Sequence, residues 1–146
     1  MARTAAVPSE PAFEGAVERL IERFRAHGTA RISLDLHAEQ GRLDRDAQVV
    51  LLRCLQEGLS NVSKHARAER VSVTVSSAED GSSVLIVTDD GDGFDADLPR
   101  HGFGLDGMVD RVGLAGGVLR VEPAPGGGTT LHVSLPGARA RVAGAA

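Results

Sequence analysis

Apolar residues recur at helical spacing in three segments of the chain, and five shorter segments are typical of strands. A helix is predicted over residues 12–26, where apolar side chains return every three to four positions, and two more are predicted over 44–66 and 105–115. Strands are predicted over residues 31–36, 70–76, 84–88, 118–122 and 129–135, which are β-branched or alternate polar with apolar residues.

The order of these elements predicts the fold class. Helix and strand segments follow one another as α-β-α-β-β-loop-α-β-β, and Asp80-Gly81 is a typical hairpin turn between two of the strands. This order predicts an α/β two-layer sandwich, with one mixed, mostly antiparallel sheet and about three helices on one face. Residues 12–136 are expected to form one domain, and residues 1–11 and 137–146 are expected to be flexible tails.

Composition and charge narrow the function classes. The chain has 146 residues and a net charge of −4, so it lacks the basic field that nucleic acids require. No segment has the length and apolar character of a membrane-spanning helix, so we expect no membrane contact by this chain and a cytoplasmic location. The single cysteine, Cys54, cannot form an intrachain disulfide or a multi-cysteine zinc site, and its apolar helical surroundings indicate a core residue.

The predicted helix over 44–66 carries polar residues on one side. At about 100° per residue, Asn61, Lys64 and His65 lie within about 80° of Glu57. The opposite side is apolar and holds Leu52, Leu55, Leu59 and Val62. The polar side has two interpretations: a solvated helix face, or one wall of a cleft where Glu57 and Asn61 offer oxygen ligands to Mg²⁺. Asn61 and Lys64 are the only asparagine and the only lysine of the chain.

Three glycine-rich segments accompany this helix. Residues 89–93 follow a strand, where the Asp89 carboxylate can accept a hydrogen bond from an amine such as that of adenine; a plain turn is the alternative. A calcium loop is disfavoured, because the segment lacks the EF-hand spacing. Residues 102–108 precede a helix and can cradle phosphate, although they are not a Walker A loop. Residues 126–130 are either a hairpin turn or a phosphate contact.

The order and spacing of these segments resemble the ATP-binding domain of histidine kinases. Residues 57–66 resemble the N box, 89–94 the G1 box, 102–108 with Arg111-Val112 the G2 box, and 128–130 with Leu135-Pro136 the closing motif. The chain looks most like the nitrate-sensor and thermosensor branch, in which Lys-His-Ala follows the N-box asparagine. The wider superfamily includes gyrase, heat-shock chaperone and mismatch-repair ATPases, and the resemblance implies its Bergerat-type fold.

The resemblance also implies ATP and Mg²⁺ as ligands and assigns roles to single residues. Asp89 would accept the adenine amine, Asn61 would coordinate Mg²⁺, and Glu57 would act as or orient the catalytic base. The remaining nucleotide-binding residues would be Gly91 and Gly93 beneath the base, Lys64 and His65 near the phosphates, Gly102, Gly104, Leu105 and Gly107 in the lid segment, and Thr129.

One part of a complete histidine kinase has no counterpart in this sequence. The family carries its phosphoacceptor histidine on a dimerising helical hairpin, whereas His37 lies at a predicted strand end and does not match that position. The implied partners are therefore a separate dimerisation and histidine phosphotransfer domain and, downstream, a response regulator. The chain would be either a fragment of a larger kinase, within its cytoplasmic part, or a stand-alone protein that acts on a partner. The alternatives are a regulatory serine kinase of the anti-sigma-factor type and a module that binds nucleotide without transfer.

Overall fold

The computed structural model describes residues 10–28, 30–37, 43–93, 105–124 and 127–137. These residues follow the predicted order of helices and strands, and the observed bounds differ from the predicted ones by only a few residues. The elements are α2 (Glu10–His27), β1 (Arg31–His37), α3 (Arg45–Asn61), the π-helix η1 (Val62–Ala66), β2 (Arg70–Ser77), β3 (Ser83–Asp89), α4 (Leu105–Leu114), β4 (Val118–Pro123) and β5 (Thr129–Leu135).

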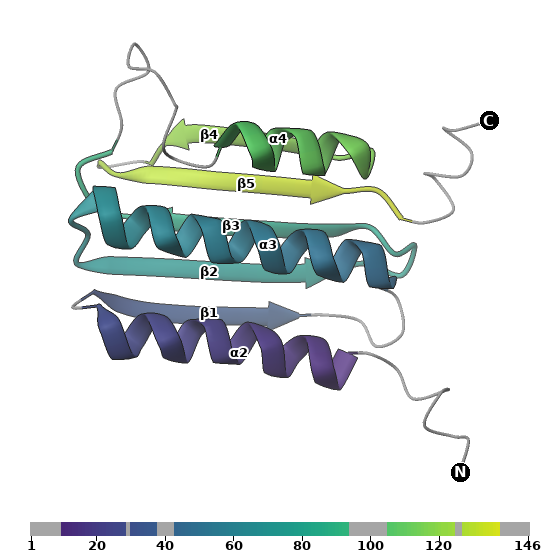
Figure 1. Cartoon of the computed structure of the whole chain (residues 1–146), viewed down its shortest axis with the longest axis horizontal. Helices are drawn as coiled ribbons and strands as arrows, with labels where there is room; N and C mark the ends of the chain where they lie inside the picture. Colours follow the sequence, from purple (N-terminus) through teal and green to yellow (C-terminus); the bar gives the residue numbers. More distant parts are fainter. Residues whose placement is uncertain (1–9, 29, 38–42, 94–104, 125–126, 138–146) are drawn as a thin grey trace.

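The five strands form one mixed sheet in the order β1-β2-β3-β5-β4. Only β1 and β2 are parallel, and the other neighbouring strands are antiparallel. Helices α2, α3 and α4 lie on one face of the sheet (Figure 1), which confirms the predicted fold class. The β2–β3 connection turns at Gly81, whose φ is +86°, while Asp80 Oδ1 accepts a hydrogen bond from the Ser82 backbone N–H at 2.9 Å.

The hydrophobic core lies between the sheet and its helices. Alternate residues of the central strands point toward the helix layer because successive side chains of a strand face opposite sides. The buried strand residues include Val71, Val73, Val75, Leu85, Val87, Leu131, Val133 and Leu135, and α2 adds Phe13, Val17, Ile21 and Phe24. None of the helices in the described part of the chain combines the length and the hydropathy that a membrane span requires.

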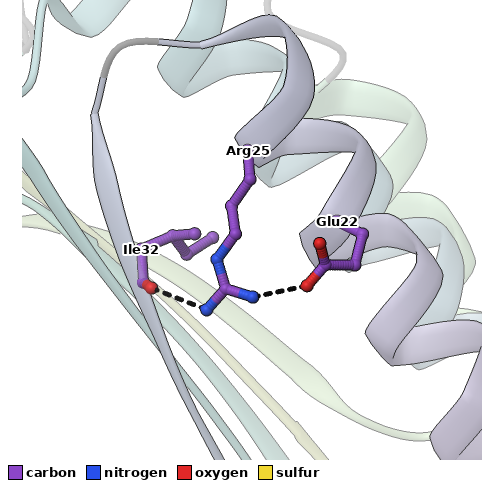
Figure 2. Close-up of polar contacts among 3 residues, drawn as sticks. All are labelled: Glu22, Arg25 and Ile32. Atoms are coloured by element: carbon purple, nitrogen blue, oxygen red, sulfur yellow. Dashed lines mark hydrogen bonds and ion pairs between the residues drawn. The ribbon is translucent and has the colours of Figure 1, made fainter.

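The side chain of Arg25 connects the C-terminal end of α2 to the edge strand β1 through hydrogen bonds. Its guanidinium donates to Glu22 Oε2 at 2.6 Å and to the backbone carbonyl of Ile32 at 3.2 Å (Figure 2). The edge strand has no neighbour beyond it in the sheet, and the side chain of Arg25 spans from the helix to its backbone. Glu22 is thereby directed toward β1 rather than away from the sheet.

Helix α3 begins and ends with identifiable backbone features. Asp44 is the N-cap, as predicted, and its Oδ1 accepts a hydrogen bond from the Ala47 backbone N–H at 2.8 Å. At the other end the helix widens into the π-turn η1, and Arg67, with a φ of +51°, ends it. Single π-turns of this kind are frequent at functional sites.

The buried face of α3 differs from the predicted one. Besides Leu51, Leu55 and Leu59, helix α3 buries Val50, Cys54 and Gly58, whereas Leu52 is only half-buried. At about 100° per residue, Cys54 lies only about 60° from Glu57. Glu57 and Asn61 therefore flank the buried stripe and are half-buried, instead of lying opposite to it. The prediction of the helix face was wrong on this point because it was drawn from the large aliphatic residues alone, without Gly58 and without Cys54, although Cys54 was itself expected in the core.

Candidate functional site

Four chain segments converge on the side of the sheet where β3 ends. We call this row of strand ends the edge of the site, and it is distinct from the edge strands β1 and β4. Figure 1 shows that α3 ends, β3 ends, β5 begins and α4 begins on this same side. The packing of Gly58 fixes how α3 approaches the sheet, because a Cβ there would lie 3.1 Å from Leu131 Cδ2 and 3.6 Å from Val87 Cγ2. Val87 and Leu131 are each two residues inward from the edge, so the following turn of α3, with Asn61, reaches the edge itself.

Asp89 is the buried carboxylate of this edge. Its side chain follows the alternation of Leu85 and Val87 toward the helix layer, and it is 6% exposed. Burial raises the pKa of Asp89 above its ordinary value, and the hydrogen bonds from the backbone N–H groups of Gly91 and Thr129 act in the opposite direction. The contact from Gly91 to Asp89 Oδ1 measures 2.9 Å. Asp89 is thus a desolvated acceptor that two backbone N–H groups hold in place.

Glycines allow the two loops of the edge to touch. Gly93 has a φ of +74°, and a Cβ there would lie 3.1 Å from the carbonyl oxygen of Gly128. Gly128 has a φ of +90°, and its Cβ would lie 1.9 Å from the carbonyl oxygen of Asp89. No side chain fits at Gly128, so the turn before β5 can pack directly against the end of β3.

Asp90 and Asp92 connect the loop after β3 to the residues that follow the π-turn η1. Asp90 Oδ1 accepts hydrogen bonds from the backbone N–H groups of Glu69 and Arg70, both at 2.8 Å, and these bonds lower the pKa of Asp90. Asp92 forms an exposed ion pair with Arg67 at 3.3 Å. The loop after β3 is thus tied to the segment that follows the π-turn of α3. Sequence reasoning missed this role of Asp90, because nothing local in the sequence indicates a partner twenty residues away.

The structure places the other predicted site residues as follows. Glu57, Asn61 and Thr129 are half-buried, Lys64 is exposed in the π-turn, Leu105 is buried, and Gly91 and Gly93 lie in the loop after Asp89. Gly107 lies in α4, where a Cβ would meet no atom within 4 Å, so no close packing there requires a glycine. Gly102, Gly104 and the side chain of His65 lie outside the described residues.

Cys54 takes no part in this edge. Its side chain is fully buried in the core, as predicted, and burial raises the pKa of the thiol to about 11. His37 lies at the end of β1, where it is exposed and pairs with Asp35.

Comparison with known proteins identifies the family. Residues 46–139 match the family model described as histidine kinase-, DNA gyrase B- and HSP90-like ATPase. The chain is 34% identical over 122 residues to the histidine-protein kinase/phosphatase UhpB of Salmonella typhimurium, covering 83% of this chain and 24% of that protein. It is 30% identical over 121 residues to the nitrate/nitrite sensor protein NarQ of Escherichia coli, covering 82% of this chain and 21% of that protein.

Solved structures agree with the fold. The mycobacterial sensor histidine kinase MprB is 26% identical, with a TM-score of 0.61, over 85% of this chain and 93% of that one. A blue-light activated histidine kinase of Erythrobacter litoralis is 18% identical, with a TM-score of 0.69, over 96% of this chain and 45% of that one, and this likeness concerns the fold alone. The chain spans only 21% to 31% of the first curated relatives that it matches.

The family model covers more than half of the chain, and the matched sensor kinases align over most of it. The buried aspartate at the end of β3, the glycine contacts around it and the convergence of α3 and α4 all lie within the matched region. The chain belongs to the histidine kinase-, DNA gyrase B- and HSP90-like ATPase family, and its relatives confirm the resemblance to sensor histidine kinases.

Proposed function

We propose that this chain binds Mg-ATP at the edge where β3 ends and transfers the γ-phosphoryl group to a histidine on a separate dimerisation and phosphoacceptor domain. A response regulator would be the next acceptor, as part of two-component signal transduction. The observation that carries the proposal is Asp89, a 6% exposed carboxylate at a strand end, in a chain of the ATPase family.

Adenine recognition rests on Asp89. A buried carboxylate that keeps acceptor capacity discriminates strongly between a base with an exocyclic amine and one without it, since an unmatched buried acceptor is costly. Two backbone N–H groups already donate to Asp89 and hold it in place. Gly128 packs against the backbone of Asp89 without a side chain of its own, and this close backbone packing supports the use of the strand end as a base-binding surface.

The phosphates would lie along the same edge, between the ends of α3 and α4. Leu105 is the first residue of α4, and the N-terminus of a ten-residue helix carries partial positive charge that favours anions. Lys64 is exposed in the π-turn and can reach toward phosphate as a compact cation. Thr129, half-buried beside Asp89, adds a hydroxyl group.

The residues at the end of α3 suit Mg²⁺. Asn61 and Glu57 lie one turn apart and are both half-buried, and together they offer a neutral amide oxygen and a carboxylate. Mg²⁺ is usually held by one or two protein oxygens together with substrate phosphates and water, so this donor set fits it. The ion would supply charge neutralisation on the phosphates, Asn61 would hold it, and Glu57 would orient or accept the proton of the attacking group.

A transfer assay tests the proposal. The chain is incubated with ATP labelled on the γ-phosphate, Mg²⁺ and the dimerisation and phosphoacceptor domain of a related sensor histidine kinase. We expect acid-labile label on that domain, because phosphohistidine is hydrolysed in acid. Acid-stable label on an added protein would indicate a serine kinase instead, and ATP binding without any transfer would reduce the function to nucleotide binding.

The metal assignment is tested separately with Asn61→Ala. We expect nucleotide affinity of the variant to respond much less to added Mg²⁺ than that of the wild type, whereas affinity measured in EDTA stays similar. Calorimetric titrations with and without Mg²⁺ give both values. Identical Mg²⁺ dependence in the two proteins would remove Asn61 from the metal site.

A further inference from the structure

A groove runs between α2 and α3 on the outer side of the helix layer, and we call it the α2–α3 groove. It has a volume of about 340 Å³ and is open to solvent. Its apolar lining includes the half-buried Leu20 and Leu52 and the 49% exposed Val49. Its polar lining includes Arg19 and Arg23 from α2 and Arg53 from α3. The groove thus combines an apolar floor with a cationic rim.

The lining of the groove includes three arginines and no acidic residue. Among the described residues, Arg19, Arg23 and Arg53 form no ion pair with a carboxylate, although the whole chain carries a net charge of −4. The acidic residues near these arginines in sequence, Glu18, Glu22 and Glu57, are not among the lining residues, and Glu22 is paired with Arg25 on the side of β1 (Figure 2). A local excess of positive charge on an acidic protein favours an acidic ligand.

The shape of the groove favours a helix as that ligand. Two packed helices lie about 8–10 Å apart and leave a furrow into which the side-chain ridge of a third helix can fit. The lining residues of α2 span two turns, about 10 Å along the axis, which is enough for apolar anchors at positions i, i+3 or i+4, and i+7. A flat bilayer or a nucleic acid duplex would meet the arginines but would not fill the recessed apolar floor.

We propose that the α2–α3 groove binds an acidic amphipathic helix of a partner protein. Apolar side chains of that helix would pack on Leu20, Leu52 and Val49, and its flanking carboxylates would pair with the three arginines. Guanidinium groups suit this task, because they bind carboxylates in bidentate geometry. The inference does not depend on nucleotide binding, since Leu52 precedes Asn61 by more than two turns of α3 and lies on a different side of the helix.

The test uses a defined probe and charge reversal in the full chain. The probe is a fluorescein-labelled peptide of about 18 residues, with leucine at i, i+3, i+4 and i+7 and glutamate beside them, long enough to populate a helix. Fluorescence anisotropy measures its affinity for the wild type, for the double variant Arg19→Glu/Arg53→Glu, and for Arg120→Glu. Arg120 is exposed on β4, away from the groove, and serves as the matched control. ATP binding and thermal unfolding of each variant verify its fold.

We expect saturable binding that weakens with added salt, a loss of about tenfold or more in the double variant, and little change in Arg120→Glu. A scrambled peptide of the same composition should bind much more weakly than the amphipathic one. Equal binding of the scrambled peptide, equal loss in Arg120→Glu, or no binding of the amphipathic peptide would overturn the proposal. Binding to vesicles of anionic phospholipid, or to a DNA duplex, in preference to the peptide would overturn it in favour of that other partner.

Discussion

Replacing Asp89 with asparagine should separate ATP binding from stability. The variant keeps one oxygen that can accept from the backbone N–H of Gly91, which now lies 2.9 Å from Asp89 Oδ1. Its other terminal atom becomes an NH₂ group, which cannot accept from the adenine amine or from the N–H of Thr129. A hydrogen bond to a charged group is worth about 1.5–3 kcal/mol, so ATP affinity should fall roughly 10- to 150-fold.

The same substitution should not weaken the fold. Burial raises the pKa of Asp89 from 3.8, so the folded protein holds the proton more tightly than the unfolded chain does. Stability contributed by the protonated group is therefore present below pH 3.8 and is lost as the pH rises through the raised pKa of the folded state. At neutral pH the wild type bears the desolvation cost of a buried charge, which asparagine avoids, and this gain offsets the loss of the hydrogen bond from the Thr129 N–H. We expect the Tm of the variant to equal or exceed that of the wild type.

Calorimetry with ATP and with inosine triphosphate measures the effect. Inosine carries a carbonyl oxygen where adenine has the amine, so the wild type should prefer ATP strongly and Asp89→Asn should lose most of that preference. Asp92→Asn is the matched control, because Asp92 lies in the same loop but is exposed and pairs only with Arg67 among the described residues. If Asp89→Asn retains wild-type affinity and preference, or if Asp92→Asn loses as much, the adenine assignment is refuted.

Three further predictions follow from the packing and the hydrogen bonds. Gly128→Ala should unfold the protein or lower its Tm severely, since the new Cβ would lie 1.9 Å from the Asp89 carbonyl oxygen. Gly113→Ala in α4 is the contrasting case, because its Cβ meets no atom within 4 Å. Thermal melts should show that Gly113→Ala stabilises the fold by up to about 1 kcal/mol. Asp90→Ala should lower the Tm at neutral pH, because the hydrogen bonds that lower the pKa of Asp90 stabilise the folded state. The difference in Tm from the wild type should shrink below pH 3.8, where protonation of Asp90 removes this contribution. A Tm difference that stays constant across this pH range would contradict the role of Asp90. Cys54, fully buried and with its thiol pKa raised to about 11, should react with a disulfide reagent at pH 8 only after denaturant is added.

The fold was predictable because its signals are local. Alternation in the strands, helical spacing in α2 and the Asp44 N-cap each depend on residues within a few positions of one another. The packing of α3 was less predictable, since Gly58 is buried through contacts with Val87 and Leu131, which lie in distant parts of the sequence. Periodicity identifies a helix face with large aliphatic residues more easily than one that buries a glycine and a cysteine.

The candidate site was predictable only in part, and for the same reason. Strand alternation continues from Leu85 and Val87 to Asp89, so the inward direction of this carboxylate is encoded locally. The motif pattern adds an expected role for Asp89, the acceptance of the adenine amine. Neither signal reveals that Gly128 touches the backbone of Asp89 from 39 positions away. Contacts of this kind depend on how β3 and β5 pair, which no short segment specifies by itself.

Two neighbouring aspartates at the end of β3 have opposite environments. Asp89 and Asp90 are adjacent, yet burial raises the pKa of the first while backbone N–H groups lower that of the second. Strand alternation directs Asp89 toward the helix layer, where burial dominates, whereas Asp90 is exposed and accepts hydrogen bonds at the start of β2. Asp90 joins the end of β3 to Glu69 and Arg70, just beyond the π-turn. The exposed carboxylate therefore ties the loop that follows the buried one to the start of β2, and Asp90 in this way contributes to the shape of the strand end that we propose as the nucleotide site.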